Sequence, residues 1–325
     1  MRRIALIGSG QLGSRHLQAI VKEPQPLAID VIEPSLEAQI MTRERLSQVK
    51  IGNPETTVHF NTSISGISKD CEVAVVASGA LGRGDLVKTL IKETEIRLFV
   101  LEKVLFQRAI EYGEIGDILA SSRASAWVNC PRRMFPGWLS LKESMSTSGP
   151  FFLSVFGGEW GLACNAIHYI DLAAFLGSST EWAYSTIGLD SQWIQSKRVG
   201  YSEITGLISA TSRRGDRISL YSGAGIDVPP QVSLVAKGFR AIVDEASSKA
   251  VVCTAAGGWA PSEISFPTKY QSELSGMVIA QLLSKATCPL TPFADSARFH
   301  IGFMQALLPH YDPYADRLYA VLPIT

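Results

Sequence analysis

The chain has 325 residues, a length typical of two domains of ordinary size, each able to bury a substantial core. Its 30 lysines and arginines equal its 30 aspartates and glutamates, and no apolar stretch reaches membrane-spanning length, so neither nucleic acid nor a membrane is an expected partner. The five cysteines are widely spaced and lack a Cys-x-x-Cys pair, and no signal peptide precedes the first strand, so we expect a cytoplasmic protein without a metal site.

The first predicted elements are a strand at residues 4–7 and a helix at about residues 12–20, joined by a glycine-rich loop. Gly8 permits a tight turn, Gly10 lets the backbone approach a phosphate, and Gly13 lets the helix pack closely on the strand. The helix N-terminus offers N–H groups and a positive dipole end to an anion. Such a string arises by chance in a glycine-rich chain, but its place between strand and helix favours a dinucleotide site over a purely structural turn.

The second predicted strand, LAIDVIE, ends at Glu33, twenty residues after the last glycine of the loop. A carboxylate there can accept hydrogen bonds from both hydroxyls of a ribose but repels a 2′-phosphate. Pro34 and Ser35 add no positive charge, and Arg43 and Arg45, further along the next helix, are less obvious phosphate partners. NAD is therefore the expected cofactor, with NADP less favoured.

Strand-like and helix-like segments alternate through the first part of the chain. Ser35 is a candidate cap for a helix that runs to about Val49, and a short strand near residues 58–60 follows. The strand EVAVVAS, a helix near residues 85–92, the strand RLFVLE, a helix near residues 108–119 and the strand AWVNC complete the series. This order predicts an α/β Rossmann fold with a doubly wound parallel sheet. The carboxyl ends of its strands bring one set of residues to a common crevice: Gly8, Glu33, Ser78, Glu102 and Asn129.

Beyond about residue 149 the pattern changes to strands joined by hairpin turns, such as RRGD and KG. Helices are expected at NAIHYIDLAAFLG and at about residues 270–284 and 294–308. We expect a dinucleotide-binding domain over residues 1–127 and an α+β domain over residues 128–325, with a mainly antiparallel, open-faced sheet for substrate binding and oligomerisation. Without a long linker the domains should pack closely around a cleft, and a homodimer or homotetramer is expected.

These features resemble the glucose-fructose oxidoreductase, inositol dehydrogenase and MocA family. The likeness covers most of the chain: the glycine fingerprint followed by His16, then LEKV, VNCPRRMFPG and HYID. It implies an NAD-dependent oxidoreductase acting on a secondary hydroxyl or ketone of a sugar, a sugar derivative or a cyclitol. In the family, the lysine of a Glu-Lys-Pro motif lies beside the nicotinamide and the reacting hydroxyl, and Lys103 matches it. The histidine of the family's Asp-x-x-x-His motif transfers a proton, and His168 matches it.

Two positions depart from the family pattern. Val104 replaces the proline, which bears on the local backbone, and Cys164 replaces the aspartate, which bears on the proton path. Hydride transfer from an alcohol requires a base for the hydroxyl proton, and His168 has a suitable intrinsic pKa, while Lys103 can stabilise an alkoxide. Both are the candidate catalytic residues; the alternatives are a surface lysine and a histidine that only packs within a helix.

The remaining candidates have structural alternatives. Asn129 either binds the nicotinamide or caps a turn. Arg132 either binds an anionic group of the substrate or lies on the surface. Trp160 either stacks on a sugar or fills the core. Asn165 is a candidate N-cap, which would leave Cys164 outside the helix. The expected cofactor contacts are Gly8, Gly10, Gln11, Leu12, Gly13, Glu33, Ser78, Glu102, Lys103 and Asn129. The expected substrate contacts are Lys103, Arg132, Trp160, Asn165 and His168.

Two other functions stay open. The family includes a yeast repressor that keeps the fold and the dinucleotide site but works by binding protein, so a non-catalytic sensor of NAD or sugar is one alternative. The other is an enzyme that keeps its NAD bound and reuses it for a net epimerisation, an elimination or a transfer of reducing equivalents.

Overall fold

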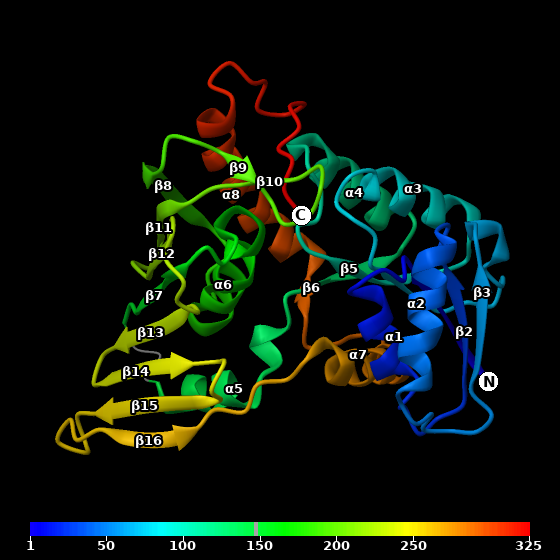
Figure 1. Ribbon diagram of the computed structural model, residues 1–325, viewed down its shortest axis with the longest axis horizontal. Coiled ribbons are helices and arrows are strands. Elements are labelled where there is room, and N and C mark those ends of the chain that lie inside the picture. The colour runs from blue at the N-terminus through cyan, green and yellow to red at the C-terminus, as the bar shows by residue number, and fades with distance from the viewer. Residues whose placement is uncertain (146–148) are drawn as a thin grey trace. The chain divides into compact units, whose positions relative to one another are not determined.

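The computed structural model describes residues 1–145 and 149–325, and these form two compact units (Figure 1). The first unit comprises Met1–Phe106, Ile110–Pro131 and Lys269–Ala294. The second unit comprises Gln107–Ala109, Arg132–Thr268 and Asp295–Thr325. Each unit is therefore assembled from segments that lie far apart in the sequence.

A seven-stranded sheet in the order β17-β6-β5-β4-β1-β2-β3 forms the centre of the first unit. Its parallel strands are β1 (Arg2–Ile7), β2 (Leu27–Ile32), β3 (Thr57–Asn61), β4 (Val73–Val76), β5 (Leu98–Glu102) and β6 (Ser125–Asn129). The short β17 (Thr291–Pro292) pairs antiparallel with β6. Every residue of β2 and β4 is buried, as expected of strands covered on both faces. The predicted parallel sheet is confirmed.

The crossovers of this sheet are helical. They contain α1 (Gly13–Ile20), α2 (Leu36–Ser47), α3 (Arg83–Glu93) and α4 (Ala109–Ser121), with a 3₁₀ turn η1 (Ile64–Gly66) before β4. The helix α2 begins where the sequence indicates, because the Ser35 hydroxyl oxygen accepts a hydrogen bond from the backbone N–H of Ala38 at 3.2 Å. This cap fixes the start of the helix directly after Glu33.

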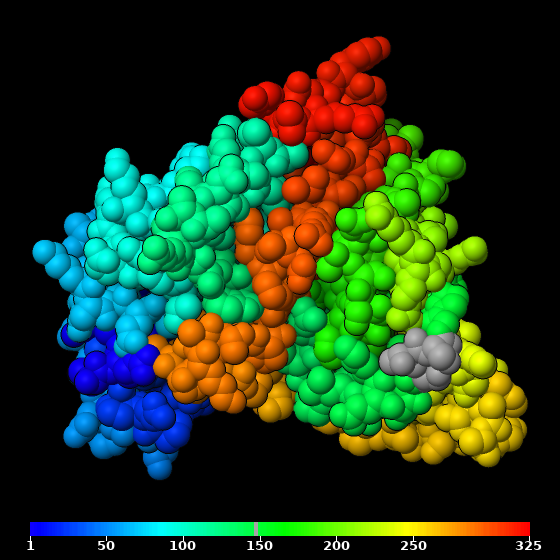
Figure 2. All heavy atoms as spheres, turned by 180° about the vertical axis from the view of Figure 1, so that it is seen from behind, coloured from blue at the N-terminus to red at the C-terminus, as the bar shows by residue number. Residues whose placement is uncertain are grey.

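The helix α7 (Gln271–Lys285) belongs to the first unit, although it follows most of the second unit in sequence. It packs along α1, whose Leu17 and Ile20 are fully buried, and Figure 2 shows the orange surface of α7 beside the dark blue of the first residues. The observed division therefore differs from the single boundary expected between residues 127 and 128. The first unit runs on to Pro131, and it also includes α7, which packs along α1.

An eight-stranded sheet in the order β16-β15-β14-β13-β7-β12-β11-β8 forms the second unit. Its strands are β7 (Phe152–Gly158), β8 (Trp182–Leu189), β11 (Gly206–Ser212), β12 (Arg217–Gly223), β13 (Gln231–Ala236), β14 (Phe239–Asp244), β15 (Lys249–Thr254) and β16 (Ser262–Ser265). Neighbours are antiparallel except β7 and β12. The two hairpins expected at RRGD and KG are present as β11–β12 and β13–β14. A separate pair joins β9 (Ile194–Gln195) to β10 (Ser202–Glu203).

Three helices accompany this sheet: α5 (Pro136–Ser144), α6 (Leu162–Gly177) and α8 (Phe293–Tyr311), and a 3₁₀ turn η2 (Pro131–Met134) precedes α5. Alternation along the strands sends one set of side chains into the core under α6 and the other set outward. The outward set is largely apolar and includes Phe156, Tyr221 and Ile242, each at least 40% exposed. Within the described part of the chain, no helix is long and apolar enough to span a membrane.

Candidate active site

The glycine loop of the first unit connects β1 to α1, and its three glycines have separate geometric roles. Gly8 has a φ of +85°, a conformation that favours glycine. A Cβ on Gly13 would lie 2.0 Å from the carbonyl oxygen of Gly8, so only glycine lets the helix start this close to the strand. A Cβ on Gly10 would meet no protein atom within 4 Å. The loop therefore leaves open space at the glycine that was predicted to face a phosphate.

The carboxylate of Glu33 lies beside this loop and is almost fully buried. Its Oε2 accepts a hydrogen bond from the backbone N–H of Ser9 at 2.7 Å, and its Oε1 accepts one from the N–H of Ser35 at 3.0 Å. An ionised carboxylate has about four lone-pair positions, so the remaining ones can serve a ligand. The position of Glu33 thus fits the ribose contact expected of it.

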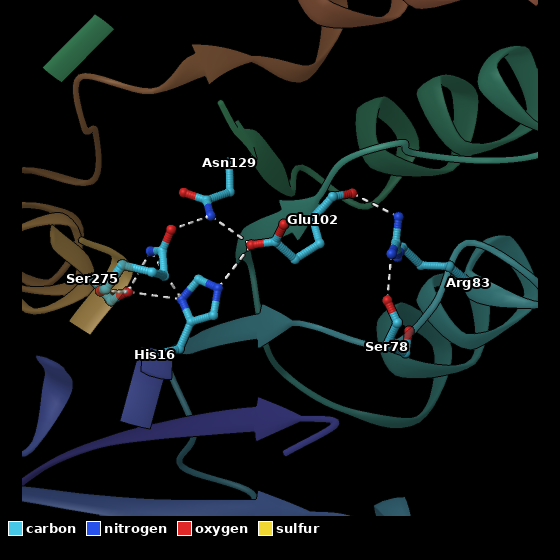
Figure 3. A network of polar contacts seen from close by, with 7 residues as sticks. His16, Ser78, Arg83, Glu102, Asn129 and Ser275 are labelled. Atoms are coloured by element: carbon cyan, nitrogen blue, oxygen red, sulfur yellow. Dashed lines mark hydrogen bonds and ion pairs between the residues drawn. The ribbon is translucent and has the colours of Figure 1, made fainter. Parts of the chain in front are cut away.

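A network of polar side chains lies at the carboxyl ends of β5 and β6 (Figure 3). Nε2 of His16 is 2.8 Å from Oε1 of Glu102, and the Asn129 amide donates to the same oxygen at 2.5 Å. Asn129 also donates to Oε1 of Gln271 at 2.8 Å, and Oγ of Ser275 is 2.8 Å from Nδ1 of His16. Since a carboxylate only accepts, His16 carries a proton on Nε2. The helices α1 and α7 are thereby joined to the strand ends.

Glu102 is the centre of this network and is 3% exposed. Burial by itself raises the pKa of Glu102, but the hydrogen bonds from His16 and Asn129 and the positive charge of Arg83 outweigh it and leave the pKa below its usual value. Glu102 is therefore an ionised carboxylate whose Oε1 accepts hydrogen bonds from both His16 and Asn129. Because Nδ2 of Asn129 donates to two protein oxygens, a ligand at this residue would contact its side-chain carbonyl oxygen.

The side chain of Arg83 anchors the backbone on both sides of Lys103, and Figure 3 shows its contacts to Ser78 and Glu102. Arg83 is 1% exposed, and its guanidinium donates to the carbonyl oxygens of Ser78, Glu102, Val104 and Leu105. The peptide bond between Lys103 and Val104, where the family has a proline, is cis. Lys103 itself is half-buried directly after β5. Its backbone is thus held in place by a residue that the sequence did not point to.

Ser78 follows β4 and lies against the glycine loop, because a Cβ on Gly8 would come within 3.0 Å of the Ser78 backbone nitrogen. The hydroxyl oxygen of Ser78 is buried and has no hydrogen-bond partner among the described residues. A buried hydroxyl normally finds a partner, so this one fits a contact with a ligand held on the loop.

In the second unit, α6 begins earlier than expected. Its N-cap is Gly161, and Asn165 lies inside the helix, where its amide donates to the carbonyl of Trp160 at 2.8 Å. The expectation that Asn165 caps the helix and leaves Cys164 outside is therefore wrong. The reason is Glu203 on β10. Its carboxylate accepts hydrogen bonds from the backbone N–H groups of Ala163 and Cys164, which lie in the first turn of α6, where N–H groups have no acceptor within the helix.

His168 follows Cys164 by about one helical turn and is half-buried. Cys164 is 7% exposed, and its Sγ lies 3.8 Å from the carbonyl oxygen of Ser202. The carboxyl of Glu203 is the acidic group at this end of α6, and burial raises its pKa, an effect that hydrogen bonds from Cys164, Ile204 and Ala163 only partly offset.

Trp160 and Arg132 are each held by other residues of the second unit. The indole N–H of Trp160 donates to the carbonyl of Tyr221 at 2.8 Å, and its ring meets that of Tyr169 edge-on at 5.5 Å. Trp160 also lines an open groove of about 550 Å³ with Lys197, Asp227, Pro230 and others. Arg132 pairs with Glu245 at 3.0 Å and stacks on the Tyr169 ring, so its charge is already balanced within the unit.

The structure thus groups the predicted residues unit by unit. The first unit holds the glycine loop with Gln11 and Leu12, then Glu33, Ser78, Glu102, Lys103 and Asn129. The second unit holds Arg132, Trp160, Asn165 and His168. Sequence reasoning missed Arg83, Gln271, Ser275 and Glu203. Of these, only Arg83 could have been suggested by its position in the sequence, because it follows shortly after the end of a predicted strand, and that indication is weak.

No family model matches the sequence, and no curated protein matches it either. Solved structures do match in fold. A UDP-N-acetylglucosamine 3-dehydrogenase from Acidithiobacillus ferrooxidans is 10% identical with a TM-score of 0.71, covering 94% of this chain and 97% of that one. An oxidoreductase from Agrobacterium radiobacter, in complex with NAD⁺, L-tartaric acid and magnesium, is 13% identical with a TM-score of 0.70, covering 97% and 98%.

A third similar structure is a super-repressor mutant of Gal80p from Saccharomyces cerevisiae, 14% identical with a TM-score of 0.71, covering 95% of this chain and 96% of that one. These structure neighbours are of the glucose-fructose oxidoreductase, inositol dehydrogenase and MocA type. The chain therefore has the fold that the sequence resemblance implied, over nearly its whole length.

Proposed function

We propose that this protein is an NAD-dependent oxidoreductase acting on a secondary hydroxyl or ketone of a sugar, a sugar derivative, including a nucleotide-activated one, or a cyclitol. The observation that carries the proposal is the glycine loop, with its tight turn at Gly8, its close helix packing at Gly13 and its open side at Gly10. The hydroxyl of Ser78 beside the loop, which lacks a hydrogen-bond partner in the described part of the chain, supports it. The sugar class is supported by the family resemblance and by one neighbour named as a UDP-sugar dehydrogenase.

A bound nicotinamide supplies a hydride acceptor or donor. On this proposal Lys103 stabilises negative charge on the substrate oxygen, and His168 takes or returns its proton. Glu33 accepts the ribose hydroxyls, which favours NAD over NADP. Arg132, balanced by Glu245, is a weaker substrate contact than the sequence indicated, whereas Trp160 lines an open groove with its ring held in place. Asn165 stays a candidate substrate contact.

We also propose a cytoplasmic location and a homo-oligomeric state. No disulfide joins any of the five cysteines in the described part of the chain, which suits a reducing compartment. The apolar outward face of the second unit's sheet suits association with another copy.

A non-catalytic sensor is the second candidate. It is favoured by Cys164 in place of the family's aspartate and by the fold similarity to Gal80p. Lys103 and His168, which a sensor does not need, favour the enzyme.

Absorbance in the reduced-nicotinamide band separates the two. Binding of NAD and NADP to the purified protein would first be measured by calorimetry, and this absorbance would then be recorded with each cofactor against a panel of sugars, sugar nucleotides and cyclitols. The enzyme predicts a signal that grows with one member of the panel. A cofactor that binds but is not reduced by any member of the panel would favour the sensor. If neither cofactor binds, the dinucleotide site itself is wrong.

A further inference from the structure

The carbonyl groups of the glycine loop are held from one side by two side chains. The carbonyl oxygen of Gly10 accepts hydrogen bonds from the backbone N–H and the hydroxyl of Ser14, at 3.0 and 2.9 Å. The carbonyl oxygen of Gln11 accepts from the Ser14 hydroxyl at 3.2 Å and from Nη1 of Arg45 at 3.0 Å. Arg45 also donates to Oγ of Ser14 at 2.6 Å and to the side-chain oxygen of Gln11. One guanidinium on α2 therefore holds the backbone and the side chain of the loop.

This arrangement fixes the direction of the loop's N–H groups. In a planar trans peptide the N–H points opposite to the carbonyl of the preceding residue. Because the carbonyls of Gly10 and Gln11 both point toward Ser14 and Arg45, the N–H groups of Gln11 and Leu12 point the other way. Neither N–H has a protein partner among residues 1–145 and 149–325. Two adjacent N–H groups without partners form an anion-binding concavity.

We infer that Arg45 is a positioning residue of the dinucleotide site, which holds the Gln11 carbonyl so that the N–H groups of Gln11 and Leu12 face the pyrophosphate. The inference rests on the proposed function and adds a residue from α2 to it. Arg45 acts through the loop backbone, since its Nη1 and Nη2 already donate to Gln11 and Ser14. The competing role for Arg45 is to bind the 2′-phosphate of NADP.

The test is binding of NADH, followed by its fluorescence, to the wild-type protein and to Arg45→Met, which keeps the apolar stem and removes every donor. Competition by ADP and by adenosine then separates the phosphate contribution from the nucleoside contribution. We expect Arg45→Met to weaken NADH and ADP by about fivefold or more, with adenosine within about twofold and the unfolding temperature little changed. Ser14→Ala should weaken ADP in the same direction, since it removes the hydroxyl that links Arg45 to the loop carbonyls.

Arg43→Met is the matched control. Arg43 has the same charge on the same helix, but it stacks on the Phe60 ring at 3.8 Å, and its loss should leave all three affinities unchanged. Equal affinity of wild type and Arg45→Met for ADP overturns the inference, as does an equal loss for adenosine. A loss confined to NADPH also overturns it and assigns Arg45 to the 2′-phosphate. Failure of the wild-type protein to bind NADH overturns the proposed function itself.

Discussion

His16 and Glu102 form a buried pair, with Nε2 of the imidazole 2.8 Å from Oε1 of the carboxylate and both side chains almost inaccessible to water. The two residues lie on α1 and at the end of β5, so the pair connects the helix that follows the glycine loop to the strand that precedes Lys103. Removing one partner of a buried pair leaves the other uncompensated, and this gives the pair a measurable effect on stability.

The first prediction is that Glu102→Gln lowers the free energy of unfolding by roughly 1–3 kcal/mol at pH 7, because a neutral amide oxygen accepts the hydrogen bonds from His16 and Asn129 more weakly than the charged carboxylate does. The pKa of Glu102 is lowered in the folded protein, so its stabilisation is present above the unfolded pKa and is lost as the pH falls. Urea unfolding at several pH values should show the two proteins converging below about pH 4. A difference that stays constant down to pH 3 would contradict this.

The second prediction concerns Arg83→Met. Four carbonyl oxygens lose their donor inside the protein, and a loss of at least about 3 kcal/mol in the free energy of unfolding is expected. Lys92→Met is the matched control, since Lys92 is an exposed cation on the same helix and its change should stay within about 0.5 kcal/mol. Denaturant unfolding of both variants checks the comparison. Similar small losses would mean that Arg83 does not hold the segment around Lys103.

The third prediction is that Lys103→Met lowers turnover by about 10²-fold or more, with NADH affinity changed little. The variant keeps the long apolar stem and removes only the ammonium group. Both constants should be measured on protein whose folding has been verified by circular dichroism. His168→Ala should lower turnover by a similar factor, and unchanged turnover in Lys103→Met would return this lysine to the role of a surface charge.

The fourth prediction has the opposite pH dependence from the first. The pKa of Glu203 is raised by burial, so ionising it costs stability in the folded protein as the pH rises above the unfolded value. Glu203→Gln cannot ionise and keeps one oxygen that can accept the N–H of Ala163, while its NH2 group replaces the oxygen that accepts the N–H of Cys164, a difference that does not depend on pH. The stability of this variant relative to wild type should therefore increase between about pH 4.5 and pH 7. A relative stability that falls over this range would show that the ionised carboxylate is the better cap.

The fifth prediction is that the protein self-associates through the outward face of the eight-stranded sheet. This face is about 30 Å wide and carries Phe156, Tyr221 and Ile242, and a face of this size can bury roughly 800 Å² per partner. Phe156→Arg combined with Tyr221→Arg should convert the oligomer to a monomer in analytical ultracentrifugation. Leu36→Arg is the control, because Leu36 is an exposed leucine of the first unit. An oligomer that survives the double substitution would place the contact elsewhere.

The local part of the site could be predicted from the sequence, because Gly8, Gly10 and Gly13 act through backbone geometry within one turn. The long-range part could not. Ser275 meets His16 across 259 positions of sequence, and no periodicity connects the two. The start of α6 was placed too late for the same reason, since its cap is Glu203 from a later strand, whereas the sequence offered only the nearby Asn165.

The position of α7 has a consequence for how the chain matures. Residues 269–294 complete the first unit, yet they are synthesised only after the whole of Arg132–Thr268. A nascent chain that ends before α7 leaves α1 without the helix that packs along it and His16 without Ser275. The helix that follows the glycine loop therefore gains its partner only after Arg132–Thr268 has been synthesised, and a fragment of residues 1–127 should be poorly folded when expressed alone.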